Sequence, residues 1–410
     1  MRKAISLLFF LFVIEFSFGQ SSDSEPISLK FDNNYFIAIS DTLTNALSNK
    51  NIIAIGEATH GSKEFIEIRR AMFFYLFRNL GYKHILLEIP QSIGLELNEY
   101  INGQRTFTYV DSILKPAKII YSKEFFSLLN EFKNYNLTNK ANSKIYIGGF
   151  DIDQYFDLSI NRIRKSLLPL DNINIQTIDS LTINIPSSHD MAFKNGKEYA
   201  SKNVQNSVLN LRQYLFSIKN TIPDTIFKTL ELCLTQLDNS YNYWNMNSKE
   251  KQDFREKIMA ENIQNMMKLL NFEKAFIWAH NNHIRNDDYG NNRIGSYLKH
   301  NLGNKYLSIA TVFEEGSYRV YYKGKLSIMN LPASTCGELA NYFDTFNDNF
   351  LLFQSKHLPP KLSNKNLYIH DVGIMQTFDI PKANKYRLIA KKDFDMYIYI
   401  KNIHSLDLPD

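Results

Sequence analysis

Residues 51–61 read NIIAIGEATHG, an apolar run that stops abruptly at a polar turn. Residues 52–55 form a short hydrophobic segment typical of a buried strand, and Gly56 ends it with the backbone freedom that a turn needs. Glu57 and His60 are therefore predicted at the carboxyl end of a buried strand, the edge where open α/β sheets bind ligands. A carboxylate three residues before an imidazole can fix the ring's tautomer and leave its other nitrogen free to accept a proton. An incidental histidine on a solvated turn is the alternative that these residues alone leave open.

Three more apolar runs end in the same way. They cover residues 85–87, 145–147 and 275–278, and they are followed by Glu88, by Asp151, and by His280 with His283. If the strands are parallel neighbours, these side chains converge with Glu57 and His60 on one cleft. Any one of them alone is more often a hydrogen-bonded buried group without a catalytic role. The four strand ends together predict a functional site at one edge of the sheet.

Predicted helices alternate with these strands. Residues 62–79 carry Phe and Ile on one helical face, Ser62 is a plausible N-cap, and Gly81 stops the helix. Residues 91–102 and 123–136 also have helical spacing. This alternation predicts a three-layer α/β fold, with a mostly parallel central sheet flanked by helices. Arg69 lies next to the apolar face of the first helix, so it points either back over the sheet or into solvent.

A helical insertion is predicted at about residues 157–270, where no convincing strand appears. Because it lies between two core strands, we expect it to act as a lid over their carboxyl ends. Its Tyr243 and Trp244 can line a cleft for a large apolar ligand, although packing between helices is the commoner use of such residues. Further along, two strands are expected over 305–313 and 318–324. No group of residues that carries chemistry is visible in 329–385.

The first 19 residues have the three parts of a secretory signal peptide. Arg2 and Lys3 precede an apolar stretch over residues 4–14, and cleavage is expected after Gly19. The apolar stretch is too short to span a bilayer comfortably, so we expect export to the periplasm or the medium without a stable membrane anchor. An uncleaved anchor is the alternative. Residues 20–410 contain no linker or repeat and are expected to form a single domain.

Charge and cysteine content narrow the functional classes. The net charge of +5 is small and the basic residues are scattered singly, which argues against a nucleic-acid partner. Cys233 and Cys336 are the only cysteines, and neither has a neighbouring Cys or His at the spacing of zinc ligands. The sequence leaves open whether these two cysteines form a disulfide.

Several of these motifs, in this order, resemble the erythromycin esterase family. Arg69 and Glu88 lie where that family carries an arginine and a strand-end glutamate. The resemblance extends from about residue 45 to about residue 409, and it is poor over 157–253 and 329–385. The matching segments are GEATHG at 56–61, REKIMAENI at 255–263, WAHNNHI at 278–284 and the closing FDMYIYIKNIHSLDLP at 394–409.

The resemblance implies a hydrolase of carboxylic esters, with a macrolide lactone as substrate and a role in antibiotic resistance. The chain lacks the Gly-x-Ser-x-Gly elbow of serine hydrolases, a Walker loop and a dinucleotide fingerprint. The expected mechanism is therefore direct attack by water, with His60 as general base and Glu57 or Glu88 orienting it. Arg69 is expected to stabilise the oxyanion, and His280 to protonate the leaving alkoxide.

Substrate binding is assigned to a second set of residues near the predicted cleft. His283 and Asp151 follow the strand ends, while Tyr243 and Trp244 belong to the insertion. The expected partner is a small-molecule ester or macrolactone.

Two other functional classes remain open at this point. Glu57, His60, Glu88 and His280 are acceptable ligands for zinc or manganese, and a metal-bound hydroxide can perform the same hydrolysis. However, E-x-x-H reverses the order of the H-E-x-x-H motif and lies on a loop, so the expected enzyme has no metal or other cofactor. A non-catalytic protein that binds iron or haem is the other class. The loss of Glu57 or His60 would favour it, and both are present.

Overall fold

The computed structural model describes residues 26–29, 31–32, 35–36, 41–116, 120–152, 156–186, 201–287, 292–333, 339–376 and 385–408. The expected signal peptide and Cys336 lie outside these ranges. Within them, no helix combines the length and the apolar character needed to cross a membrane.

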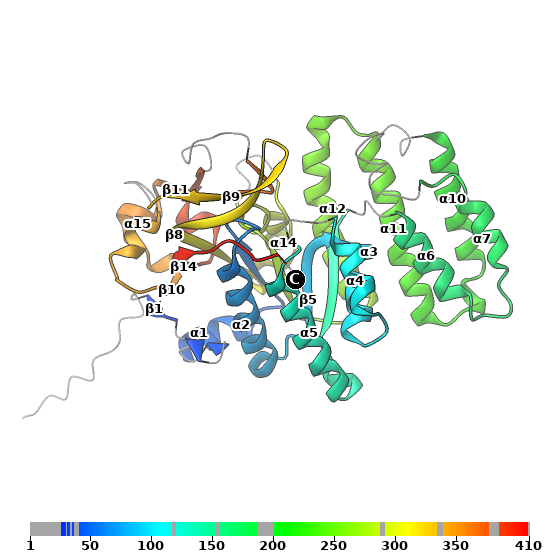
Figure 1. Ribbon diagram of the computed structural model, residues 1–410, viewed down its shortest axis with the longest axis horizontal. Coiled ribbons are helices and arrows are strands. Elements are labelled where there is room, and N and C mark those ends of the chain that lie inside the picture. The colour runs from blue at the N-terminus through cyan, green and yellow to red at the C-terminus, as the bar shows by residue number, and fades with distance from the viewer. Residues whose placement is uncertain are drawn as a thin grey trace, which may run out of the picture.

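A ten-stranded sheet forms the centre of the molecule (Figure 1). Its strands run in the order β1 (Ile27–Ser28), β10 (Phe350–Gln354), β14 (Met396–Ile403), β8 (Tyr306–Tyr322), β4 (Ile52–Glu57), β7 (Ala275–His280), β5 (His84–Pro90) and β6 (Tyr146–Asp151). β9 (Lys325–Leu331) and β12 (Met375–Gln376) pair with β8. The six strands from β14 to β6 are parallel to one another, while β10 pairs antiparallel with β1 and β14, and β9 pairs antiparallel with β8. The predicted mostly parallel sheet is confirmed.

Helices cover both faces of this sheet, so its central strands are buried on both sides. Ile53 and Ile55 face a core shared with α2 (Lys63–Leu80), α3 (Gln91–Ile101), α4 (Phe107–Leu114) and α5 (Lys123–Thr138). Ile52 and Ala54 face a second core shared with α12 (Ser248–Leu269), α14 (Ile294–Leu302) and α15 (Leu339–Asp344). α2 ends as predicted at Gly81, whose φ of 74° lies in the left-handed region that favours glycine.

Shorter elements complete the described part of the chain. The helices are α1 (Asp41–Ser48), α13 (Asn281–Ile284), α16 (Pro360–Ser363) and α17 (Ala390–Asp393). The strands are β2 (Phe31–Asp32) with β3 (Tyr35–Phe36), and β11 (Asn366–His370) with β13 (Lys385–Ile389), each pair forming a two-stranded sheet of its own.

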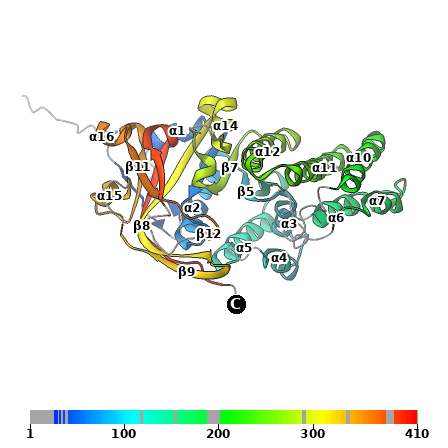
Figure 2. The ribbon, with the colours of Figure 1, turned by 90° about the horizontal axis from the view of Figure 1, so that it is seen from above.

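The helical insertion lies beside the sheet. The helices α6 (Phe156–Leu167), α7 (Ile175–Thr182), α10 (Lys202–Ser217) and α11 (Asp224–Asn245) pack around an apolar core of their own, in which Cys233 is buried. They contact α3 and α12 beyond the edge strand β6, and Figures 1 and 2 show them extending away from the sheet. The expectation of a lid is therefore wrong for these four helices, because their apolar faces are satisfied by one another. We call them the helical extension.

One long strand replaces two predicted strands. β8 runs without interruption from Tyr306 to Tyr322, and Gly316 within it has a φ of 134° that other residues rarely adopt. Its first half pairs with β4 and β14 in the sheet, and its second half forms an antiparallel hairpin with β9. The strand therefore continues past the carboxyl end of β4, next to the turn that carries His60.

Candidate active site

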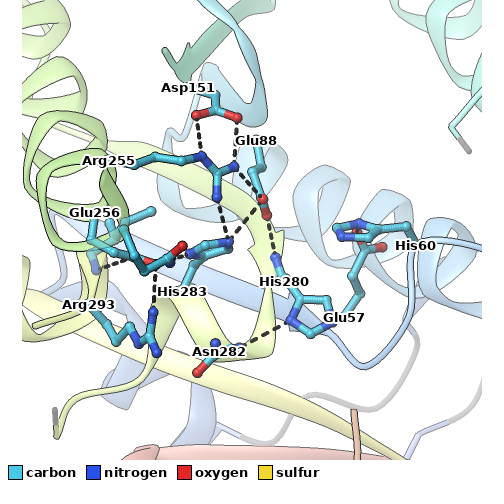
Figure 3. A network of polar contacts seen from close by, with 12 residues as sticks. Glu57, His60, Glu88, Asp151, Arg255, Glu256, His280, Asn282, His283 and Arg293 are labelled. Atoms are coloured by element: carbon cyan, nitrogen blue, oxygen red, sulfur yellow. Dashed lines mark hydrogen bonds and ion pairs between the residues drawn. The ribbon is translucent and has the colours of Figure 1, made fainter. Parts of the chain in front are cut away.

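The carboxyl ends of the parallel strands meet as predicted. β4 and β7 are neighbours, and Glu57 at the end of one is paired in register with His280 at the end of the other. β5 lies on the other side of β7 and carries Glu88. The structure brings these residues together with His60, Asp151 and His283 in one polar network (Figure 3).

His60 is oriented by Glu57. The Nδ1 atom of His60 lies 2.5 Å from Glu57 Oε1, so Nε2 is the nitrogen left for a substrate or a water. Burial opposes the ionisation of Glu57, but the charges of Arg69 and His60 outweigh it and lower the pKa of this carboxyl. Burial likewise opposes protonation of His60, and the charges of Glu57 and Glu88 outweigh it and raise the pKa of the imidazole. A carboxylate paired with an imidazole in this way is suited to general base catalysis.

Arg69 forms a buried ion pair with Glu57. Its side chain is completely buried, its Nη1 lies 2.7 Å from Glu57 Oε2, and its guanidinium carbon lies 4.4 Å from the centre of the Trp278 ring. The expected role of Arg69 in stabilising an oxyanion does not fit this position, because the side chain has no exposed surface, is paired with Glu57 and does not line the pocket beside His60. Arg69 instead holds Glu57 ionised.

Glu88 joins two strand ends and a helix. Its Oε2 accepts a hydrogen bond from the backbone N–H of His280 at 2.8 Å, and its Oε1 lies 3.0 Å from His283 Nε2 and 3.2 Å from Arg255 Nη2. Burial opposes its ionisation, but the charge and hydrogen bond of His283 hold the pKa of Glu88 well below its ordinary value. Glu57, rather than Glu88, therefore orients His60, and Glu88 fixes the backbone at His280.

His283 is held as a cation between two carboxylates. Besides Glu88, its Nδ1 lies 2.7 Å from Oε1 of Glu256, which is fully buried. Although burial opposes protonation, these two carboxylates raise the pKa of His283 to about 10. Glu256 also accepts hydrogen bonds from Arg293 Nη1 at 3.0 Å and from the backbone of Ile294 at 3.2 Å. All of its charge is therefore compensated inside the protein.

Asp151 binds Arg255 with both oxygens, at 2.9 Å from Nε and 2.7 Å from Nη2. The polar atoms of Asp151 and His283, both expected to bind substrate, are therefore engaged by protein side chains. Sequence reasoning left Arg255 and Glu256 out of the site, although both belong to the REKIMAENI motif. Both lie within α12, which packs on β6, and this packing brings them to the strand ends.

His280 is neutral and lies beside His60. The two ring centroids are 5.1 Å apart, and His280 Nδ1 accepts a hydrogen bond from the backbone of Asn282 at 3.4 Å. Its Nε2–H is directed at the Val372 carbonyl, at 3.4 Å, while Asp371 Oδ1 lies closer at 3.0 Å but off the N–H direction. Burial and the charge of His60 lower the pKa of His280 to about 3. The expected role of His280 as proton donor to the alkoxide is therefore unsupported at neutral pH.

Asp371 is a site residue in a region from which none was expected. It directly follows β11, just as the other acidic groups follow their strands, so the same signal was present in the sequence. Burial raises the pKa of Asp371 to about 7. The backbone of Val372 donates to the Ala58 carbonyl at 2.6 Å, which docks this segment on the turn that carries His60.

A small apolar pocket opens beside this network. Its volume is about 40 Å³, enough for a few waters or a single functional group. Three titratable side chains and seven apolar ones line it: Glu57, His60, Glu88, Ile66, Leu87, Ile89, Ile120, Phe125, Trp278 and Leu406.

The aromatic residues assigned to substrate binding do not line this pocket. Trp244 packs on the core of the helical extension, and the Lys251 ammonium lies 4.7 Å from its ring and 5.1 Å from that of Tyr243. Neither aromatic ring belongs to the pocket lining. In the same described ranges, no group of three or more His, Cys, Asp and Glu side chains is arranged to hold a metal ion.

The family model for erythromycin esterase matches residues 78–403, which is most of the chain. The chain belongs to the erythromycin esterase family. The matched range contains Glu88, Arg255, Glu256, His280 and His283, while the turn with Glu57 and His60 precedes it. Membership supports a hydrolase.

Two curated relatives are similar to parts of the chain. YbfO of Bacillus subtilis, named as a hydrolase, is 24% identical over 271 residues, which cover 59% of this chain and 58% of YbfO. Erythromycin esterase type II of Escherichia coli is 27% identical over 110 residues, which cover 27% of this chain and 25% of that esterase. The chain thus spans just over half of one relative and a quarter of the other.

Solved structures share the fold over nearly the whole chain. A Bacillus cereus protein superimposes with a TM-score of 0.79 at 19% sequence identity. The superposition covers 94% of this chain and 97% of the Bacillus cereus protein. A substituted erythromycin esterase in its open conformation superimposes with a TM-score of 0.63 at 16% sequence identity. The superposition covers 90% of this chain and 95% of that esterase. The fold of this erythromycin esterase is therefore shared over 90% of the chain.

Proposed function

We propose that the chain is a hydrolase that cleaves a carboxylic ester with a water activated by His60. The contact of 2.5 Å between Glu57 Oε1 and His60 Nδ1, next to an apolar pocket, carries this proposal. His60 Nε2 removes a proton from the water as its oxygen attacks the ester carbonyl. When the tetrahedral intermediate collapses, the same imidazolium returns the proton to the leaving alkoxide, so one histidine serves as base and then as acid.

The surrounding charges keep this pair in its working state. The buried Arg69 keeps Glu57 ionised, and the ionised Glu57 favours the imidazolium that forms during attack. Glu88 on the neighbouring strand β5 accepts a hydrogen bond from the backbone N–H of His280 and contacts His283, which holds the carboxyl end of β7 against the site. Because this set supplies a base and its counter-charge, we propose that no metal is needed.

The proposed substrate is the lactone of a macrolide such as erythromycin. Family membership and the name of the Escherichia coli relative support this choice. The apolar lining contributed by Ile66, Leu87 and Phe125 suits an ester group that leaves water for a dry site.

Mass spectrometry of erythromycin incubated with the purified protein tests the proposal. We expect a product heavier than erythromycin by one water, formed by the wild-type protein and lost in His60→Ala. Activity should survive prolonged chelation followed by gel filtration. If the chelated protein were inactive and zinc or manganese restored it, a metal-bound hydroxide would replace His60 as the source of the nucleophile. If no macrolide and no simple ester were hydrolysed, the esterase proposal itself would be wrong.

A further inference from the structure

The pocket leaves most of a large ester outside it. Its volume is about 40 Å³, whereas sites that enclose a drug-sized ligand measure roughly 300–1,000 Å³. The ester group and the attacking water fill such a pocket, and the remainder of a macrolactone has to lie on the surface around its rim. A substrate with a large apolar body therefore needs an apolar surface at that rim.

The hairpin of β8 and β9, extended by β12, has one largely apolar face that is exposed at Ile328 and Met375. Arg319 on β8 is paired with Ile328, and Tyr321 is paired with Leu326 on β9 and with Met375 on β12. Directly paired side chains point to the same face of a sheet, and residues two apart along a strand share that face. These five side chains therefore lie on one face.

The other face of the hairpin packs into the protein. Tyr318 and Val320 are buried in the core shared with α2, and the Tyr318 hydroxyl donates to Gln376 Oε1 at 2.7 Å. Gln376 and Tyr318 thus share the inner face, which places Met375 on the outer one, in agreement with the pairing. The same alternation places Ile374, whose carbonyl accepts from the backbone of β8, on the side opposite to Met375.

The outer face begins at the rim of the pocket. The backbone N–H of Arg319 donates to the carbonyl of Gly61, the residue after His60, at 3.0 Å. The Arg319 guanidinium reaches across and donates from Nη2 to the carbonyl of Tyr121 at 2.8 Å. Tyr121 follows Ile120, which lines the pocket. Figure 2 shows the hairpin passing α2 and reaching toward α5, so the face leads away from the pocket mouth.

We propose that this outer face, formed by Tyr321, Leu326, Ile328 and Met375, binds the apolar body of the ester substrate while the ester group enters the pocket. The proposal rests on the esterase function. Ile328 is 61% exposed and Met375 is 74% exposed, and Tyr321 and Leu326 are half-buried. Exposed apolar residues that occur singly need no explanation. Here they are neighbours by strand pairing, and Arg319 on the same face is hydrogen-bonded through its backbone to Gly61, the residue after His60.

Ester chain length tests the proposal with one chromophore. The specificity constant, kcat/KM, is measured for p-nitrophenyl acetate and p-nitrophenyl octanoate with the wild-type protein and with Ile328→Lys and Met375→Lys. Each variant should lower the octanoate-to-acetate ratio about tenfold, because a charge replaces apolar contact with the longer chain alone. The loss should appear mainly in KM, and the thermal melting midpoint should stay near that of the wild-type protein, because both side chains are exposed.

Two controls separate this surface from a general effect of added charge. Ile374→Lys changes an exposed residue, 48% accessible, one position from Met375 but on the opposite side. Leu168→Lys changes a residue, 68% exposed, at the helical extension. Both should keep the wild-type ratio.

The outcomes distinguish this proposal from the one on which it rests. Hydrolysis of both esters with an unchanged ratio in Ile328→Lys and Met375→Lys would overturn the binding surface and leave the esterase intact. Light scattering gives the oligomeric state of each protein. If the wild-type protein were a dimer and the Ile328→Lys and Met375→Lys variants were monomers, the face would be assigned to a second copy of the chain instead. Absence of hydrolysis by the wild-type protein would overturn the esterase function first.

Discussion

Glu57→Gln should destabilise the protein far more than a substitution that removes a partly exposed ion pair of α2, the helix that carries Arg69. Glu57 is the carboxylate that faces Arg69, and the Arg69 side chain has no solvent-exposed surface. Removing one partner of a buried ion pair leaves the other charge uncompensated, which costs about 3–5 kcal/mol of the free energy of unfolding. Glutamine keeps the size of the side chain, so packing changes little.

The residue after Arg69 on α2 provides a matched control. Arg70 pairs with Glu131, but these side chains are 20% and 27% exposed. Partly exposed pairs contribute about 0–1 kcal/mol, so Glu131→Gln should have a small effect. Urea denaturation followed by tryptophan fluorescence measures both variants, and Trp278 against the Arg69 guanidinium reports on the site itself.

The pH dependence of the Glu57 effect has a defined sign. The pKa of Glu57 is lowered below 4.5 in the folded protein, so its stabilising contribution is present above pH 4.5 and disappears as the pH falls through the lowered value. The difference in stability between the wild-type protein and Glu57→Gln should therefore narrow in acid. Equal losses for Glu57→Gln and Glu131→Gln at neutral pH would refute the view that Glu57 compensates a buried charge.

Of four further predictions, two concern His60, one concerns His283 and one concerns the amino terminus. His60→Ala removes the general base, so turnover should fall about 10²–10⁴-fold. The ion pair of Glu57 with Arg69 is kept, so the urea midpoint should change little. Near-normal turnover would remove His60 from the mechanism. Because the neutral ring is the base and its pKa is raised above 6.5, wild-type kcat/KM should rise with pH through a midpoint above 6.5, and a pH-independent profile would argue against this base. The pKa of His283 is raised from 6.5 to about 10 in the folded protein. The difference in melting temperature between the wild-type protein and His283→Gln should therefore be largest below pH 6.5 and disappear as the pH approaches 10. A difference that does not change with pH would contradict a cationic His283. A chain that begins at Gln20 should be fully active, and sequencing of exported protein should find Gln20 first, whereas an intact Met1 on cytoplasmic protein would contradict export.

The strand-end residues were predictable because buried parallel strands have a local signature. Continuous apolar runs followed at once by Glu57, Glu88 and His280 predict both the strand and the edge at which it ends. The same signature preceded Asp371, but β11 belongs to a separate two-stranded sheet. Only the folding of the chain back onto the Ala58 carbonyl makes Asp371 a neighbour of His280.

Roles were harder to predict than positions, because a role depends on burial and on partners. Arg69 has the same helical position whether it faces a substrate or a carboxylate, and its zero exposure decides between them. His280 and His283 are three residues apart, yet the pKa of the first is lowered to about 3 and that of the second raised to about 10. The pKa of His283 is raised, against the effect of burial, by its direct contacts with Glu256 and Glu88, whereas burial and the charge of His60 lower that of His280. Sequence spacing does not place Glu256, on another helix, beside His283.

The separate core of the helical extension has a consequence for how this part of the chain evolves and unfolds. Leu211, Leu230 and Leu234 pack on one another rather than on the sheet, so their substitution is felt inside the extension alone. Such a unit can open and close by itself, and hydrogen exchange should find its amides less protected than those of β4 and β7. It is also free to change its sequence without disturbing the strand ends, which accounts for the poor resemblance over residues 157–253. About a quarter of the chain, residues 157–253, can therefore differ in sequence while the strand-end residues keep their positions.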